Sequence, residues 1–416
     1  MEIYNLSKVT DDGNVSQGKV GTISSKMDAG FHGSLKALRI LDRQGPLAQS
    51  HIAKNLGVSP PAALSYFRQL DKEGLVVAAD KKITPGRGRP FELWDVDRLR
   101  NFTIGIMISP PKLVIAMADF ADNIVLQQEH DVSSQATCEN IEAIIDVFIV
   151  EAFDYLAKSD YNLRFACACL PGPVNMPIIP KIDIKGVFSR YDIPVVSTPL
   201  MMAMLFGEAR RFPSDCTVCV VDWDFGIGVA PCCGDRVLFG DDSQYAVVYN
   251  KRKVSDFGHQ RIKKNGRVCP CGNRGCLEAY AGGRAVIEQL GRPDICSLEN
   301  LLAAASNGDS EVLKELGMAA YYMGHALSQF VLLMGVDKIV ITGPLSGIFP
   351  LVRDDFNAGL GDYLEKDEVE SLQSSHSPDP LGLMVMGSCR AARQMFLYSD
   401  VPDDAGLVPY LVPSDF

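Results

Sequence analysis

The chain has 416 residues, of which 47% are hydrophobic and 22% are charged. This length exceeds the roughly 250–300 residues at which a single core stops growing, so we expect two or three domains. The composition excludes a largely disordered or fibrous protein, and no run approaches the roughly 18 apolar residues of a membrane span. Residues 1–30 lack a basic and then apolar leader, and three of the twelve cysteines cluster beside a histidine. We therefore expect a cytoplasmic protein with one metal site.

The net charge of −11 is unevenly distributed. Residues 31–100 carry 12 basic and 7 acidic side chains, whereas residues 101–416 carry 25 and 40. DNA phosphates would repel an acidic body, but they attract a segment of net charge +5 through counterion release. The charge therefore favours DNA binding by residues 31–100.

Residues 1–30 are polar and lack periodicity, so we interpret them as an N-terminal arm. Apolar spacing then predicts three short helices: one from Ser34 to Gly45, one over residues 47–56, and one that Ser59 caps and Gly74 ends. Pro60 suits the first turn of the third helix. This order of elements is typical of a helix-turn-helix.

A β-hairpin is predicted next, with strands at residues 75–79 and 91–94 and a turn at residues 80–90. Four cations crowd the turn: Lys81, Lys82, Arg87 and Arg89. Helices followed by such a hairpin predict a winged helix-turn-helix DNA-binding domain over residues 31–98, whose third helix enters the major groove. The alternative is a three-helix scaffold that only docks on the next domain.

The predicted DNA contacts divide by position. Base contacts are expected from the start and exposed side of the third helix: Ser59, Ala62, Ser65, Tyr66 and Gln69. Arg68 and Lys72 are expected at phosphates, and Arg87 and Arg89 in the minor groove or on the backbone.

From Phe102 onward, apolar runs alternate with helical stretches, which predicts two α/β lobes over residues 101–416. The predicted strands cover residues 103–108, 113–119, 164–170, 216–222 and 338–342. The predicted helices cover residues 140–158, 201–211, 311–333 and 386–397.

The most specific local pattern is His259, Cys269, Cys271 and Cys276 within eighteen residues. One imidazole and three thiols are soft ligands that suit tetrahedral Zn²⁺, and a closed shell of four protein ligands is typical of a structural site. The alternative is three buried cysteines that bind no metal.

Residues 256–283 closely resemble the signature of the ROK family of repressors and sugar kinases. Further matching motifs lie at residues 86–90, 171–173, 206–208, 224–228 and 342–347. The resemblance implies an α/β fold in which the winged helix-turn-helix precedes a two-lobed, actin-like ATPase (ribonuclease H-like) domain. It also implies a structural zinc on the His259 cluster and a homodimer or homotetramer.

Three departures from the family motifs argue against a kinase. The position of the catalytic base is Leu200, which cannot accept a proton. The first phosphate loop falls on residues 107–111 and holds two prolines, which remove amide donors. Asp224 replaces a glycine of the second phosphate loop and would repel phosphate. We therefore expect no catalysis and no ATP.

The sugar-binding positions are kept in part, at Asp256, His259 and Glu278. They predict a sugar or sugar-like effector, with an unrelated effector or a partner protein as alternatives. The sequence thus predicts a transcriptional repressor of sugar-related genes that binds a palindromic operator in double-stranded DNA, without membrane attachment. Two other functions are a diverged ROK sugar kinase fused to a DNA-binding domain, and a sensor that no longer binds DNA.

Overall fold

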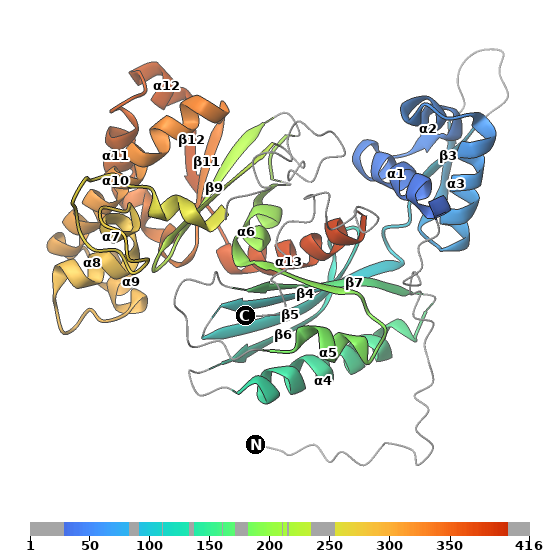
Figure 1. Ribbon diagram of the computed structural model, residues 1–416, viewed down its shortest axis with the longest axis horizontal. Coiled ribbons are helices and arrows are strands. Elements are labelled where there is room, and N and C mark those ends of the chain that lie inside the picture. Colours follow the sequence, from blue (N-terminus) through green and yellow to red (C-terminus); the bar gives the residue numbers. More distant parts are fainter. Residues whose placement is uncertain are drawn as a thin grey trace.

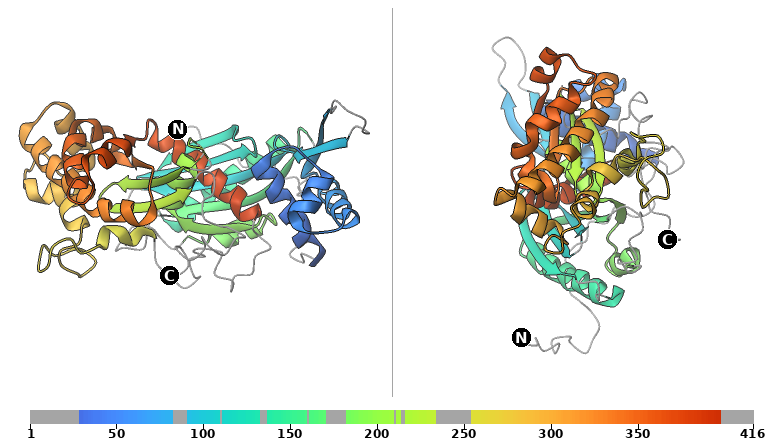
Figure 2. Two further views of the ribbon diagram at one scale, coloured as in Figure 1. Left: turned by 90° about the horizontal axis from the view of Figure 1, so that it is seen from above. Right: turned by 90° about the vertical axis from the view of Figure 1, so that its left-hand side faces the viewer.

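The computed structural model describes residues 29–82, 91–109, 111–132, 137–159, 161–170, 182–209, 211–213, 216–233 and 254–397. A small N-terminal unit lies at one end of a larger body that consists of two lobes (Figures 1 and 2). The predicted fold class is confirmed. Residues 1–28, the wing arginines Arg87 and Arg89, and the motif at residues 171–173 lie outside the described residues.

The N-terminal unit has three helices and a three-stranded sheet in the order β1-β3-β2. Its elements are α1 (Ala29–Gln44), β1 (Leu47–Ala48), α2 (Gln49–Leu56), α3 (Pro60–Lys72), β2 (Val76–Lys82) and β3 (Phe91–Val96). Ser59 caps α3 by accepting a hydrogen bond from the Ala62 amide at 3.4 Å, as predicted. The prediction of helix at Leu47 and Ala48 is wrong, because these residues pair with Trp94 and Leu93 of β3.

The first lobe is built on a five-stranded sheet in the order β6-β5-β4-β7-β8. The strands are β4 (Asn101–Ser109), β5 (Lys112–Asp119), β6 (Ile124–Asp131), β7 (Asn162–Leu170) and β8 (Val195–Pro199). Side chains alternate between its two faces. Ile104 and Ile106 pack toward α4 (Cys138–Leu156) and α5 (Ile184–Ser189), whereas Met107 packs toward α6 (Leu200–Ala209) and α13 (Pro380–Leu397).

The second lobe has a four-stranded sheet in the order β10-β9-β11-β12. Its strands are β9 (Thr217–Trp223), β10 (Ile227–Cys233), β11 (Lys338–Thr342) and β12 (Gln373–His376), and β9, β11 and β12 run parallel. Its helices are α7 (Glu278–Ala281), α8 (Gly283–Leu290), α9 (Leu298–Ser306), α10 (Ser310–Met334), α11 (Phe349–Leu360) and α12 (Lys366–Ser371). Two 3₁₀ turns, η1 (Val254–His259) and η2 (Pro344–Ile348), complete it.

Helices α6 and α13 cross with their backbones in direct contact. A Cβ atom on Gly387 of α13 would lie 1.7 Å from the Ala203 carbonyl oxygen of α6, and one on Gly207 would lie 2.1 Å from the Leu383 carbonyl oxygen. Only glycine permits this approach. The prediction that the last helix begins at Met386 is too short by six residues, because α13 begins at Pro380.

The C-terminal end of α13 contacts the N-terminal unit (Figure 1). Arg393 of α13 forms an ion pair with Asp42 of α1, and Arg39 Nε donates to the Leu397 carbonyl at 2.8 Å. Arg98 Nη1 also donates to Asp42, at 2.6 Å. Within the described ranges, no helix is both long enough and apolar enough to cross a bilayer.

Candidate functional site: a thiol and imidazole cluster, a cleft and an exposed helix

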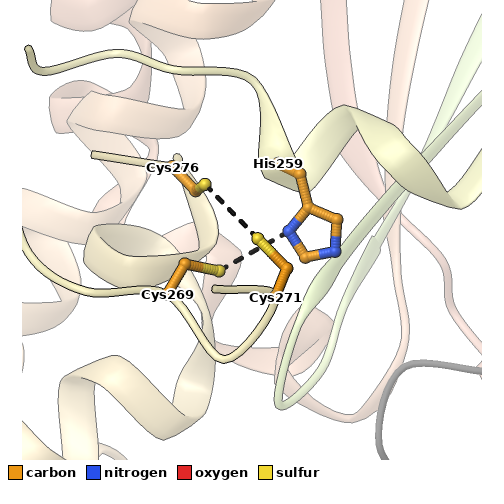
Figure 3. Close-up of side chains that lie close together, drawn as sticks. All are labelled: His259, Cys269, Cys271 and Cys276. Carbon is orange, nitrogen blue, oxygen red and sulfur yellow. Dashed lines mark hydrogen bonds between the residues drawn. The ribbon is translucent and has the colours of Figure 1, made fainter. Parts of the chain in front are cut away.

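The four predicted metal ligands converge in the second lobe (Figure 3). His259 ends η1, and the three cysteines lie on the loop that leads to α7. Their ligand atoms all lie within 4.8 Å of one another. Gly275 sets the loop in place with φ of +80°, and a Cβ there would lie 1.6 Å from the Lys263 carbonyl oxygen. The fold therefore forms a cluster that can hold a metal ion.

Two distances within the cluster match the edges of a tetrahedral site. The Cys271 and Cys276 sulfurs are 3.8 Å apart, and Cys269 Sγ lies 3.6 Å from His259 Nδ1. Bonds of about 2.3 Å to sulfur and about 2.0 Å to nitrogen give tetrahedral edges of roughly 3.5–3.8 Å. Burial raises the pKa of the Cys269 thiol to about 12, so a metal ion must displace its proton to bind.

A cavity of about 930 Å³ opens between the two lobes. Several residues singled out in the sequence line it: His259, Glu278, Leu200, Asp224 and Met107. Asp256 lies on η1, and its side chain lies outside the described residues. The size is that of a small-molecule site, which typically measures about 300–1,000 Å³.

His259 belongs to both the cluster and the cavity. Its Nδ1 faces the cysteines, while the other ring nitrogen lies on the opposite side of the ring (Figure 3). Glu278, the first residue of α7, directs Oε2 toward Gly226 and Gly258, where an added Cβ would lie 2.6 Å and 3.2 Å away. The two side chains thus reach one wall of the cavity from neighbouring elements.

The positions of the family's kinase machinery also meet in this cavity. Leu200 is buried at the first position of α6. The Phe225 amide donates to the Asp224 carboxylate at 2.6 Å. In the loop at residues 224–228, this amide therefore already has an acceptor within the protein. Burial raises the pKa of Asp224 above its ordinary value.

Three lining residues were not singled out in the sequence: Asp222 at the end of β9, Ser377 after β12, and Arg284 on α8. The sequence pattern around Asp222 could have identified this residue. It interrupts the apolar alternation of Val218 and Val220, whose side chains pack toward α6 and α13. A carboxylate at the next position of that face is unusual in a buried strand.

The predicted DNA-facing residues of α3 separate into two groups. Ser59, Ser65, Arg68 and Lys72 are exposed, and Ala62 is half-buried. Tyr66 instead lies over α1, because a Cβ on Gly33 would lie 2.3 Å from its ring, and Gln69 accepts a hydrogen bond from Ser34 Oγ at 2.7 Å. Sequence periodicity also missed Leu64, which is 37% exposed on the outer face.

The described geometry defines a class of protein: a helix-turn-helix unit with a wing, joined to a two-lobed α/β body with a central cavity and a metal-binding cluster. Comparison with family models agrees. Residues 34–77 match the winged helix-turn-helix DNA-binding model, and residues 251–386 match the ROK family model. A winged helix-turn-helix therefore precedes a ROK family domain in this chain.

Curated relatives of this chain include regulators. It is 23% identical over 344 residues to the DNA-binding transcriptional dual regulator NagC of Escherichia coli K12, covering 75% of this chain and 80% of that protein. It is 24% identical over 373 residues to the DNA-binding transcriptional repressor Mlc of the same strain, with coverages of 81% and 88%. The xylose repressor of Bacillus subtilis strain 168 is 22% identical, with coverages of 77% and 84%.

Solved structures share the fold. A ROK family transcriptional regulator described as a homolog of the Escherichia coli MLC protein matches with a TM-score of 0.68 and 18% identity, over 91% of this chain and 98% of its own. The ROK hexokinase of Thermus thermophilus matches with a TM-score of 0.55 and 18% identity, over 70% of this chain and 98% of its own. The body therefore has the architecture found in both regulators and kinases of the family.

Proposed function

We propose that this protein is a cytoplasmic, DNA-binding transcriptional repressor of sugar-related genes, and that its cleft binds the effector. The observation that carries the proposal is the outward face of α3, where Ser65, Arg68 and Lys72 are exposed; the basic wing that the sequence predicts supports the same function. The relatives named as regulators support the same function, and one of them is named a xylose repressor.

The proposed DNA interface is the exposed face of α3 together with the wing. Ser59, Ala62 and Ser65 are proposed to contact bases, and Arg68 and Lys72 phosphates. Leu64 suits apolar contact with thymine methyl groups. Arg87 and Arg89 remain assigned to the minor groove or backbone. A homodimer or homotetramer would place two such units on half-sites of a palindromic operator, spaced by about 10 bp or a multiple of it.

Helix α13 is the proposed link between effector and DNA. Its first turn lines the cleft through Pro380, Leu381 and Met384, and its last turns hold Asp42 and Arg39 of α1. An effector that changes how the lobes close around α13 therefore changes the orientation of the winged helix-turn-helix. Such a coupling is typically worth about 1–3 kcal/mol.

Zinc is the proposed occupant of the His259, Cys269, Cys271 and Cys276 cluster, and its role there is structural. The four side chains complete its shell, so it would tie η1 to the loop before α7. Coordination through Nδ1 leaves the Nε2 proton of His259 as a donor toward the cleft. Together with Asp256 and Glu278, this donor is proposed to bind hydroxyl groups of a sugar or sugar-like effector.

The second candidate function, a sugar kinase, has the shared fold in its favour. Three features argue against phosphoryl transfer. Leu200 offers no base, Pro111 removes an amide from the first loop, and Asp224 both carries charge and occupies the Phe225 amide. ATP is therefore not proposed as a cofactor.

A capture experiment tests the proposed function without assuming an effector. The full-length protein is incubated with sheared DNA from its own genome at two salt concentrations, and the retained fragments are sequenced. We expect enrichment of a palindromic site, more strongly at low salt. The absence of enrichment at both salt concentrations would contradict a regulator. Sustained turnover with ATP and hexoses that is lost in Glu278→Gln would support the kinase.

A further inference from the structure

The carboxyl ends of three parallel strands meet at the cleft. Asp222, near the end of β9, pairs in register with Thr342, the last residue of β11. His376, the last residue of β12, pairs with Ile341, so Ser377 follows in the same row as Thr342. Ligands of open α/β sheets bind outside the carboxyl ends of the strands. Both Asp222 and Ser377 line the cavity there.

Each end of this row has a buried polar atom without a hydrogen-bond partner. Asp222 Oδ1 is inaccessible to solvent and unpartnered, and so is Ser377 Oγ, whose residue is 2% exposed. An unpaired buried polar group costs about 1–3 kcal/mol, and more when it is charged. Asp222 Oδ1 lies beside Gly343, and both Asp222 and Ser377 line the cavity, so a bound molecule that draws these side chains toward it would supply the missing hydrogen bonds.

Two acidic side chains lie at the β9 end. Asp224 follows Asp222 two residues later and also lines the cavity. Burial raises the pKa of Asp222 well above its ordinary value, and the charge of Asp224 adds to the effect. Within the part of the chain that the structure describes, no ion pair joins either carboxylate to a lysine or arginine. Neither carboxyl group is therefore held in an ion pair, although Arg284 lines the same cavity.

We propose that the cleft binds an organic ammonium compound, with its positively charged nitrogen at Asp222 and Asp224 and a second hydrogen-bonding group at Ser377. The proposal rests on the proposed function, because it names the chemical class of the effector. Neighbouring strands lie about 4.8 Å apart, so the two polar groups of the ligand are about 10 Å apart at most. An ammonium group brings three donors and neutralises the pair.

The rest of the cavity favours an organic molecule over a bare metal ion. Among the described residues, only the His259 cluster brings three or more metal-ligating side chains together. Asp222 and Asp224 do not belong to such a group. The cavity also has apolar lining residues: Met107, Leu200, Met201, Ile227 and Met384. A phosphate group is disfavoured at the same place, because it would meet two carboxylates.

Isothermal titration calorimetry of the full-length protein tests the proposal with matched pairs of probes. Glucosamine is compared with its neutral counterpart N-acetylglucosamine, and 5-amino-1-pentanol with 1,5-pentanediol, all below the pKa of the amines. Magnesium chloride forms a third arm. We expect each amine to bind at least tenfold more tightly than its neutral partner, and magnesium to give no saturable heat.

Three variants assign the site. The double change Asp222→Asn with Asp224→Asn should remove the preference for the amine, and Ser377→Ala should weaken amino alcohols more than a simple alkylamine such as pentylamine. Glu299→Gln is the control, since Glu299 is an exposed carboxylate that lines the same cavity from α9. Thermal unfolding without probe shows that each variant is folded.

The outcomes separate the proposals. Equal affinity for amine and neutral partner, tight binding of magnesium alone, or no binding by any amine would overturn the ammonium site. None of these results affects the capture of operator DNA, which tests the regulator by itself. Conversely, selective amine binding without any DNA enrichment would keep the ammonium site and remove the repressor.

Discussion

Asp42 of α1 accepts hydrogen bonds from both Arg393 of α13 and Arg98, which follows the wing. The Arg393 side chain is only 4% exposed and Asp42 only 9%, so this ion cluster is almost entirely removed from water. Burial lowers the pKa of Arg393 to about 10, which still leaves it charged at neutral pH. A buried charge of this kind persists only when it is paired.

The first prediction is that Asp42→Asn destabilises the protein strongly. It leaves the buried Arg393 without its counter-ion at the interface, whereas Arg98 keeps Asp95, and it should cost about 3–5 kcal/mol in the free energy of unfolding. Arg393→Met should cost less, because Asp42 keeps Arg98. Urea denaturation measures both. Asp95→Asn is the control, since Asp95 lies 3.7 Å from Arg98 at a partly exposed position. Equal effects for Asp42 and Asp95 would contradict the interface.

The second prediction concerns the wing. Replacing Arg87 and Arg89 together by alanine should weaken operator binding and reduce the slope of log K against log salt by roughly 2, about one for each lost phosphate contact. Fluorescence anisotropy over a salt series measures the slope. Lys366→Ala is a matched loss of charge on α12, at an 87% exposed side chain of the acidic body, and should leave the slope unchanged. An unchanged slope in the double variant would refute the wing assignment.

The third prediction separates two adjacent residues of α3. Ser65→Ala should change the preferred operator bases with little change in stability, because Ser65 is exposed. Tyr66→Ala should instead lower the free energy of unfolding by about 2–3 kcal/mol, because its ring packs over Gly33. Sequencing of DNA selected by each variant, together with chemical denaturation, decides the matter. Altered base preference in a stably folded Tyr66 variant would return this residue to the DNA interface.

The fourth prediction tests the metal. Cys276→Ser should reduce bound zinc, measured by inductively coupled plasma mass spectrometry, from about one ion per chain to well below that value, and should lower the melting temperature. Cys296→Ser, an exposed cysteine outside the cluster, should change neither. One zinc per chain in the Cys276 variant would show that the ion binds elsewhere.

The fifth prediction is a pH dependence of stability. The folded protein holds a proton on Asp222 more tightly than the unfolded chain does, because burial raises the pKa of this group. The free energy of unfolding that depends on Asp222 is therefore highest below the ordinary carboxyl pKa. It falls as the pH rises from that value through the raised pKa of the folded protein. Asp222→Asn should remove that loss, so the difference in unfolding free energy between variant and wild type grows with pH. A difference that is constant from pH 4 to pH 8 would contradict the assignment.

Local sequence signals predicted a large part of this fold. The cap at Ser59, the apolar stripe of Ala63, Phe67 and Leu70, and the buried strand at residues 338–342 are each encoded within a few residues. The four ligands of the metal cluster were predicted because they are close in sequence and their chemistry is specific. These features depend on neighbours along the chain, which a single sequence displays.

The features that we did not predict from the sequence depend on contacts between residues that are far apart in the chain. Leu47 and Ala48 continue a helical pattern, yet they form a strand because Trp94, far along the chain, offers its backbone. Tyr66 and Gln69 are predicted to contact DNA, and the sequence did not reveal that α1 half-buries both of them. The row of Asp222, Thr342 and Ser377 exists only after three strands align, of which β9 lies more than a hundred residues before the other two.

The crossing of α6 and α13 has a mechanical meaning. Gly207 and Gly387 bring the two backbones into contact at the crossing, so at these two residues no side chain separates the helices. Leu200 and Met201, the first residues of α6, line the cleft. We therefore expect a shift of α6 to displace α13 at the glycine crossing. The shorter part of α13, before the crossing, lies at the cleft, and the longer part contacts the winged helix-turn-helix. We therefore expect a small closure around an effector to cause a larger displacement of the DNA-binding unit.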